Sequence, residues 1–368
     1  MTTTTPPARS TTTERAGDTA RRLRTGLVLL AGVSLLTGLN AGLLRLGVWA
    51  PVASTRLGDL HGPVMVLGFM GSLIALERAQ ALRNPLAYLA PALLAAGSVA
   101  LIAGAPLLLG KLLLLDGALA FTAVAIALWR RAPLGLVAAQ AVGTAFAALA
   151  AGLWLVTDLA VILPLLAAFL VIMIASERAE LAQLTMGRRA VPALLAATVV
   201  VSASAVATLV APDWGARALG LGCLLVAVWL IRDDVGRRMI RSTGLRRFNA
   251  AALLLGNLWL GVAGVVWAVG GQPSASGAYD AVIHGVFLGF GMSMIMAHAP
   301  IIFPTVLGRP LPYRPAMWGP LALLHLGMAT RLTGGLAAIA PLYRLGGVLT
   351  VLSVLAFAIT VIYSVVKR

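Results

Sequence analysis

The chain contains little charge and almost no cysteine. Only 11 % of its 368 residues are charged, whereas 60 % are apolar, and this composition excludes an ordinary soluble globular domain. The single cysteine, Cys223, excludes an internal disulfide and a metal site built from several thiolates. Because it lies within an apolar run, we expect it to be a small buried residue of the core.

Acidic residues are scarce as well. The chain has 12 Asp and Glu against 28 Lys and Arg, which gives a formal net charge of +16. A basic face on a soluble domain would indicate nucleic-acid binding, but here the basic residues are distributed over short loops between apolar runs. The sequence therefore predicts a membrane protein, with the lipid bilayer and no nucleic acid among its partners.

Apolar runs long enough to cross a bilayer, about 20 residues each, recur along nearly the whole chain. They predict an all-α, polytopic membrane bundle of about 12 transmembrane helices in a single domain, residues 25–368. The predicted spans are 26–48, 61–80, 86–109, 112–129, 133–156, 159–176, 190–211, 215–231, 247–271, 279–303, 315–335 and 341–365. Residues 1–24 are rich in Thr, Pro and Arg, and they are predicted to form a disordered tail. No small-residue cleavage site follows the first apolar run, so we expect that run to be a retained span.

The distribution of basic residues predicts the orientation of these spans. With the amino terminus in the cytoplasm, 22 of the 28 Lys and Arg residues lie on the cytoplasmic side, as the positive-inside rule requires. Both termini are thus predicted to be cytoplasmic, with the protein in the inner (cytoplasmic) membrane of the cell.

Two short motifs suggest an internal repeat. Glu-Arg-Ala occurs at residues 77–79 and 177–179, at the ends of spans two and six, and a His-Gly pair occurs in spans two and ten. One interpretation is chance in a sequence rich in Gly, Ala and Leu. The other is a threefold repeat of a four-helix unit, which places spans two, six and ten in equivalent positions around a shared interior. We then expect charge pairing between the two Glu-Arg elements, as a structural clamp or as a proton entry point.

The chain has only four histidines, and all lie in or beside apolar spans: His61, His284, His298 and His325. An ionisable side chain in a membrane span is costly and is therefore a candidate functional residue. The alternative for each is a neutral histidine that bonds to a helix carbonyl.

His61 and His284 are expected to lie at the same depth, near the extracytoplasmic ends of spans two and ten. Each precedes a glycine, Gly62 or Gly285, which leaves room beside the ring. Two neutral imidazoles across a smooth groove suit a flat macrocycle bound through both axial positions, so they predict a low-spin haem b with bis-His ligation. Zinc or copper would need further nitrogen or sulfur ligands at that depth, and the sequence offers none.

The segment HGPVM at residues 61–65 resembles the start of the second helix of haem-copper oxidase subunit I, where the histidine binds the low-spin haem. The twelve-span plan with a partner histidine on helix ten is similar to that superfamily. Residues 284–311 combine a histidine, a Met-bearing stretch and a Gly-Arg-Pro-Leu loop, and they look closer to the NnrS family of membrane haem- and copper-containing proteins. This resemblance implies a role in tolerance of nitric oxide and nitrosative stress.

The chain departs from the oxidase pattern at the active centre. Spans six and seven contain no histidine, whereas oxidases bind their copper through histidines on helices six and seven. Where oxidases carry a His-x-His pair, Val282 and Val286 stand two residues to either side of His284. We therefore do not expect a terminal oxidase. The resemblance then implies one low-spin haem and no haem-copper centre.

A second site is predicted near the cytoplasmic ends of spans ten and eleven. Met294 and His298 lie on one helix face, and His325 lies at a similar depth in span eleven. Thioether and imidazole ligands suit copper, and a second haem is the other candidate for this site. The alternative interpretation is that the methionine packs as an ordinary core residue.

Two charged residues belong with His284. Asp280 precedes it by one helical turn and is expected either to orient its ring or, as the safer interpretation, to cap the helix. Arg331, near the outer end of span eleven, is placed by depth where it could approach a haem propionate.

These features favour a haem-b membrane protein of NnrS type, acting in electron transfer or nitric-oxide handling. Its expected partners are respiratory or denitrification electron-transfer proteins. Two other functions stay open: a twelve-span secondary transporter, and an assembly factor that delivers haem or copper to a respiratory or denitrification enzyme. A transporter would take up its substrate without haem, and an assembly factor would hold its cofactor weakly.

Overall fold

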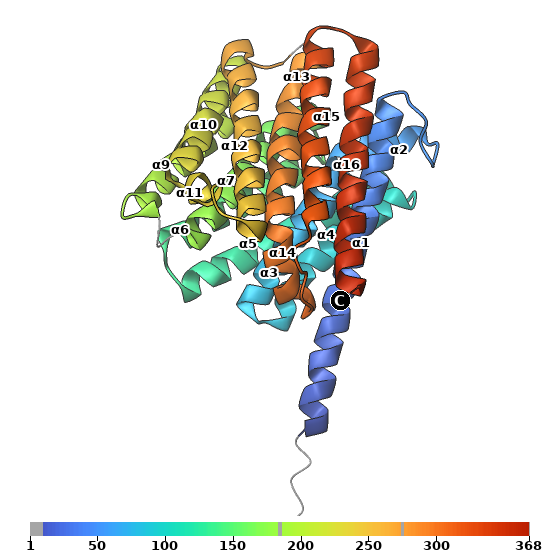
Figure 1. Cartoon of the computed structure of the whole chain (residues 1–368), viewed down its shortest axis with the longest axis vertical. Coiled ribbons are helices and arrows are strands. Elements are labelled where there is room, and N and C mark those ends of the chain that lie inside the picture. Colours follow the sequence, from blue (N-terminus) through green and yellow to red (C-terminus); the bar gives the residue numbers. More distant parts are fainter. Residues whose placement is uncertain (1–9, 183–185, 274–275, 368) are drawn as a thin grey trace, which may run out of the picture.

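A computed structural model describes residues 10–182, 186–273 and 276–367, and helices account for most of them (Figure 1). No strand occurs within these ranges. The helical elements are α1 (Ser10–Arg45), α2 (Thr55–Pro63), η1 (Val64–Gly71), α3 (Ser72–Leu82), η2 (Pro85–Tyr88), α4 (Leu89–Ile102), α5 (Leu107–Arg131), α6 (Gly135–Leu153), α7 (Leu159–Leu181), α9 (Ala190–Ala207), α10 (Pro212–Asp233), α11 (Gly236–Met239), α12 (Gly244–Gly270), α13 (Ser276–His284), η3 (Gly285–Met292), α14 (Ser293–Leu307), η4 (Pro315–Met317), α15 (Trp318–Leu336) and α16 (Ala340–Val366).

Eleven helices in the described part of the chain are long and apolar enough to cross a membrane. They correspond to predicted spans one to ten and span twelve, so the prediction of an all-α polytopic bundle is confirmed. The remaining predicted span is α15, which lies along α16 (Figure 1). It is not among the eleven because His325 and Arg331 make it less apolar than its neighbours.

The amino-terminal segment differs from its prediction. Residues 10–24, which the sequence assigns to a disordered tail, continue α1 as helix and extend beyond the rest of the bundle (Figure 1). Once a membrane helix exists, adding residues to its end avoids the cost of nucleation. An ion pair between Arg21 and Asp18, 2.9 Å apart and one turn along the helix, supports this extension. Residues 1–9 lie outside the described residues.

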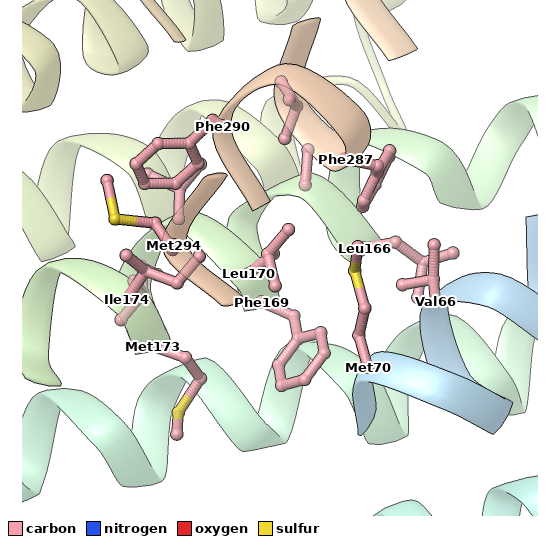
Figure 2. Packing of buried hydrophobic residues seen from close by; sticks show 14 of the residues in the cluster. Val66, Met70, Leu166, Phe169, Leu170, Met173, Ile174, Phe287, Phe290 and Met294 are labelled. Atoms are coloured by element: carbon pink, nitrogen blue, oxygen red, sulfur yellow. The ribbon is translucent and has the colours of Figure 1, made fainter. Parts of the chain in front are cut away.

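The core is centred on α7. Nearly every residue from 162 to 179 is buried, as expected of a helix that is surrounded by others on all sides. Spans two and ten pack against it, and Figure 2 shows Met70, Leu170 and Phe290 of these three spans in one apolar cluster. A methyl group added at Gly291 would lie 2.9 Å from Leu170 and 3.4 Å from Met70. Spans two, six and ten therefore share one interior, as the repeat hypothesis expects, while the threefold unit itself stays a prediction.

Both histidine-bearing spans change helix type in the middle. Span two runs through α2, the π-helix η1 and α3, and span ten runs through α13, the π-helix η3 and α14. In span two the π-helix begins two residues after Gly62, and in span ten it begins at Gly285 itself. Such segments are rare and are frequent at functional sites. Hydropathy did not predict them.

Close helix packing between α15 and α16 depends on glycine. A methyl group at Gly346 would lie only 2.3 Å from the backbone nitrogen of Arg331, so the two backbones meet where no side chain fits.

We expect Gly346→Ala to destabilise the protein by about 1–3 kcal/mol, because overpacking forces the backbones apart. Thermal unfolding in detergent measures this effect. Gly32→Ala is the matched control, because a methyl group there meets nothing within 4 Å; equal melting temperatures for the two variants would contradict the prediction.

Candidate functional site

The structure brings His61 and His284 together, although 223 positions separate them in the chain. Their ring centres lie 6.3 Å apart, with an angle of 27° between the ring planes. A metal–imidazole bond is about 2.0–2.1 Å, so two rings that bind one metal from opposite sides, each centre ~1.1 Å from its ligating nitrogen, have centres roughly 6.2–6.4 Å apart. The observed separation therefore matches the spacing of two axial ligands on one metal.

Hydrogen bonds fix which ring nitrogen of each histidine is available. The Nδ1 atom of His61 lies 2.8 Å from the carbonyl oxygen of Gly38 on α1, and Nδ1 of His284 lies 3.1 Å from the carbonyl oxygen of Asp280. A carbonyl oxygen only accepts, so each Nδ1 carries the proton and each Nε2 keeps its lone pair. Neither Nε2 atom has a hydrogen-bond partner among the described residues. Both histidines thus present a free ligating nitrogen.

Asp280 orients His284 and does not cap the helix. It lies inside α13, and its Oδ1 atom is 3.0 Å from Nδ1 of His284. Arg331 binds its carboxylate in a bidentate manner, from Nε at 2.8 Å and from one terminal nitrogen at 2.6 Å, and the hydroxyl of Tyr343 donates to Oδ1 at 2.8 Å. The capping interpretation of Asp280 is therefore wrong. Arg331 holds this carboxylate, which in turn fixes the ring of its histidine.

A cavity surrounds the two imidazoles. It has a volume of about 250 Å³, and residues from α1, α7, α13 and α16 line it together with span two. Binding sites for small molecules and cofactors are typically about 300–1,000 Å³ and mostly apolar with a few polar groups. Gly42 keeps the wall beside His61 open, because a methyl group there would lie 3.2 Å from the ring. The two imidazoles thus face a mostly apolar cavity slightly smaller than this range.

Two residues of this cavity were missed in the sequence. Tyr343 reaches Asp280 from α16, and Arg45 lines the cavity from the end of α1. Arg45 is exposed and makes one long hydrogen bond, 3.4 Å, to the carbonyl of Gly58. In the sequence it counted only as a loop charge, and nothing in its local pattern distinguishes it from the others.

The two histidines of the second predicted site have different partners. Nε2 of His298 lies 3.0 Å from a guanidinium nitrogen of Arg178, whereas Nδ1 of His325 accepts a hydrogen bond of 2.9 Å from the indole of Trp259. Within the described ranges, no hydrogen bond or ring contact joins the two histidines, and no group of three or more His, Cys, Asp or Glu could hold a metal ion. Met294 shares a cavity with His298, but His325 does not line it. Among the described residues no contact joins all three side chains, so the second site stays a prediction.

The two Glu-Arg elements do pair across spans. Arg78 lies 3.7 Å from Glu177 and 3.1 Å from Glu180 on α7, and 2.9 Å from its neighbour Glu77. Arg178 instead binds Asp234, at 2.8 and 2.7 Å. One arginine of the repeat therefore joins spans two and six, and the other joins α7 to the end of α10.

The eleven apolar spans and the buried ion pairs between them define a polytopic helical membrane protein. The chain belongs to the family DUF8744, a domain of unknown function, whose model matches residues 22–366. A comparison with curated protein sequences found no match. The family description assigns no activity, so the resemblance to NnrS proteins stays a prediction.

Proposed function

We propose that this protein is an integral membrane haem protein of b type, in which His61 and His284 are the two axial ligands of the iron. The observation that carries the proposal is the separation of 6.3 Å between the two ring centres. This spacing matches two imidazoles on opposite sides of one metal, at about 2.0–2.1 Å each.

The donor set favours a porphyrin over a bare metal ion. Zinc and copper sites in proteins take three or four ligands from the chain, whereas only two imidazoles meet here. Asp280 is the nearest carboxylate, and Arg331 and Tyr343 already occupy it. A porphyrin supplies four nitrogens itself and needs only two axial ligands.

When bound, such a haem supplies a reversible one-electron change at iron, with both axial positions filled by protein. The protein's residues determine how it is held. Gly38 and Asp280 orient the two rings through Nδ1, and Arg331 keeps Asp280 ionised and in place. Arg45, whose side chain is largely uncommitted, is the cation available to the haem carboxylates. Electron transfer with respiratory or denitrification proteins, or nitric-oxide handling of NnrS type, is the role we propose for this arrangement.

The test is the haem content and optical spectrum of the purified protein. Protein from haem-replete cells is expected to contain haem b and to give the sharp reduced bands of a low-spin, six-coordinate iron. A colourless preparation from such cells would overturn the proposal. Retention of haem through extended washing separates a resident cofactor from the weak binding of an assembly factor.

We also propose that both termini are cytoplasmic, from the excess of basic residues on that side. In a Cys223→Ala background, a cysteine at Val156 is expected to react with a membrane-impermeant thiol reagent in intact cells, because Val156 is 82 % exposed in the loop after α6. A cysteine at Arg131, the exposed last residue of α5 just before α6 begins, is expected to react only after permeabilisation. The reverse labelling pattern would show the opposite orientation.

A further inference from the structure

A second cavity lies in the other half of the bundle, between spans two, six and ten. It has a volume of about 90 Å³ and opens at the surface, and Met70 lines both this cavity and the one that holds the two histidines. Partly buried apolar side chains, among them Leu73 of α3 and Ile295 and Phe303 of α14, form part of its wall. On membrane-spanning helices such side chains face lipid, so a ligand reaches this cavity from the bilayer.

The polar groups of this cavity gather on one side. Glu177 is 7 % exposed and makes no hydrogen bond, and its nearest cation, Arg78, is 3.7 Å away. Glu77 and His298 also line the cavity. Arg178 cannot serve a ligand here, because Asp234 and His298 take its guanidinium. A buried carboxyl without a hydrogen bond is costly unless a ligand supplies the partner.

The charges restrict the head group of such a ligand. Three carboxylates, those of Glu77, Glu177 and Glu180, share the one guanidinium of Arg78. This excess of negative charge disfavours a phosphate or a fatty-acid carboxylate. The described residues here offer no group of three His, Cys, Asp or Glu that could hold a metal ion. A neutral or a cationic head group is compatible with these charges. A neutral one with oxygen atoms, joined to an apolar body that matches the rest of the wall, also supplies the hydrogen-bond partner that Glu177 lacks among the described residues.

We propose that this cavity binds a lipid-soluble quinone, with Glu177 as the hydrogen-bond partner of one ring oxygen. A carboxyl group donates when protonated and accepts when ionised, so it can pair with both the carbonyl of a quinone and the hydroxyl of its reduced form. The aliphatic wall takes the tail, and the opening toward lipid admits the molecule sideways. The site does not depend on haem, because none of its polar residues touches His61 or His284.

The experiment measures quinone on the purified, haem-assayed protein. Solvent extraction is expected to recover quinone at a fixed ratio to protein, and a decyl-tailed benzoquinone is expected to bind the delipidated protein in calorimetry. Glu177→Leu, which removes both oxygens of the carboxyl group, should weaken this binding about tenfold through loss of one hydrogen bond. Ile295→Trp should abolish it by filling the cavity.

Two control variants separate the effect on the cavity from the effects of lost charge and of added bulk elsewhere. Glu180→Gln removes the same charge beside Arg78 from a residue that does not line the cavity, and Ile359→Trp adds the same bulk at a residue of α16 that is 66 % exposed. Both should bind the benzoquinone as the wild type does, and all four variants should keep the wild-type haem content. Wild-type protein that binds no quinone, binding that both Glu177→Leu and Ile295→Trp leave unchanged, or binding of a decyl amine in place of the quinone would each overturn the proposal.

Discussion

Alanine at His61 or at His284 is expected to remove the low-spin haem from the purified protein, with haem per protein falling at least tenfold. Each substitution deletes one of the two proposed bonds to iron. Among the described residues that line the cavity there is no other histidine or cysteine, and the carboxylate of Asp280 is bound by Arg331. Haem analysis and the reduced-minus-oxidised spectrum measure the loss. His325→Ala is the matched control, because His325 bonds to Trp259 outside the cavity, and it should keep the wild-type spectrum.

A rescue experiment separates lost ligation from lost folding. Glycine at His284 leaves a space of the size of the missing ring, and free imidazole in the medium is expected to restore a six-coordinate spectrum. Folded His61→Ala or His284→Ala protein that retains wild-type haem content and spectrum would show that these rings are not the ligands.

Removing the carboxylate of Asp280 is expected to destabilise the protein by about 3–5 kcal/mol, because Arg331 is left as a buried charge without its partner. Arg331 is 8 % exposed and Asp280 9 % exposed, so both side chains are buried. Thermal unfolding of Asp280→Ala in detergent measures the effect. The conserved-size change Tyr343→Phe, which removes only the hydroxyl that donates to Asp280, should cost far less.

The double variant Asp280→Leu with Arg331→Met tests whether the pair acts through His284 as well. Replacing both charges together should recover most of the stability, because no unpaired charge remains. His284 would still lack the carboxylate that orients it, so the haem spectrum or midpoint potential should remain altered. A purely structural role predicts recovery of both properties, and a double variant as unstable as Asp280→Ala would contradict the paired-charge account.

Much of the fold could be predicted because a membrane span is a property of a local run of residues. The length of each apolar run predicted the position of the eleven spans. The helix α15 is not among these eleven, because His325 and Arg331 lower its apolar content. The approach of His61 to His284 could be predicted too, because both open equivalent spans and therefore lie at one depth.

The partners of individual side chains could not be predicted, because they depend on how each helix is rotated about its axis. The sequence indicates only how deep in the membrane a residue lies. His298 and His325 lie at similar depths, yet one turns toward Arg178 and the other toward Trp259. The partners of Asp280 come from residues 51 and 63 positions away, and no local pattern connects them. The cross-span pairing of Arg78 with Glu177 was predictable because the repeated Glu-Arg element supplied that missing information.

The two π-helical segments determine how the side chains at one end of a span are rotated relative to those at the other end. An α-helix advances by about 100° per residue, and a π-helix advances by less because each of its turns holds more residues. Over the eight residues of η1 this difference accumulates, so the direction in which Glu77 points is fixed relative to that of His61. The π-helical turns therefore set the angle between the two side chains. As a result, one continuous span presents His61 to the cavity with the two histidines and Glu77 to the second cavity.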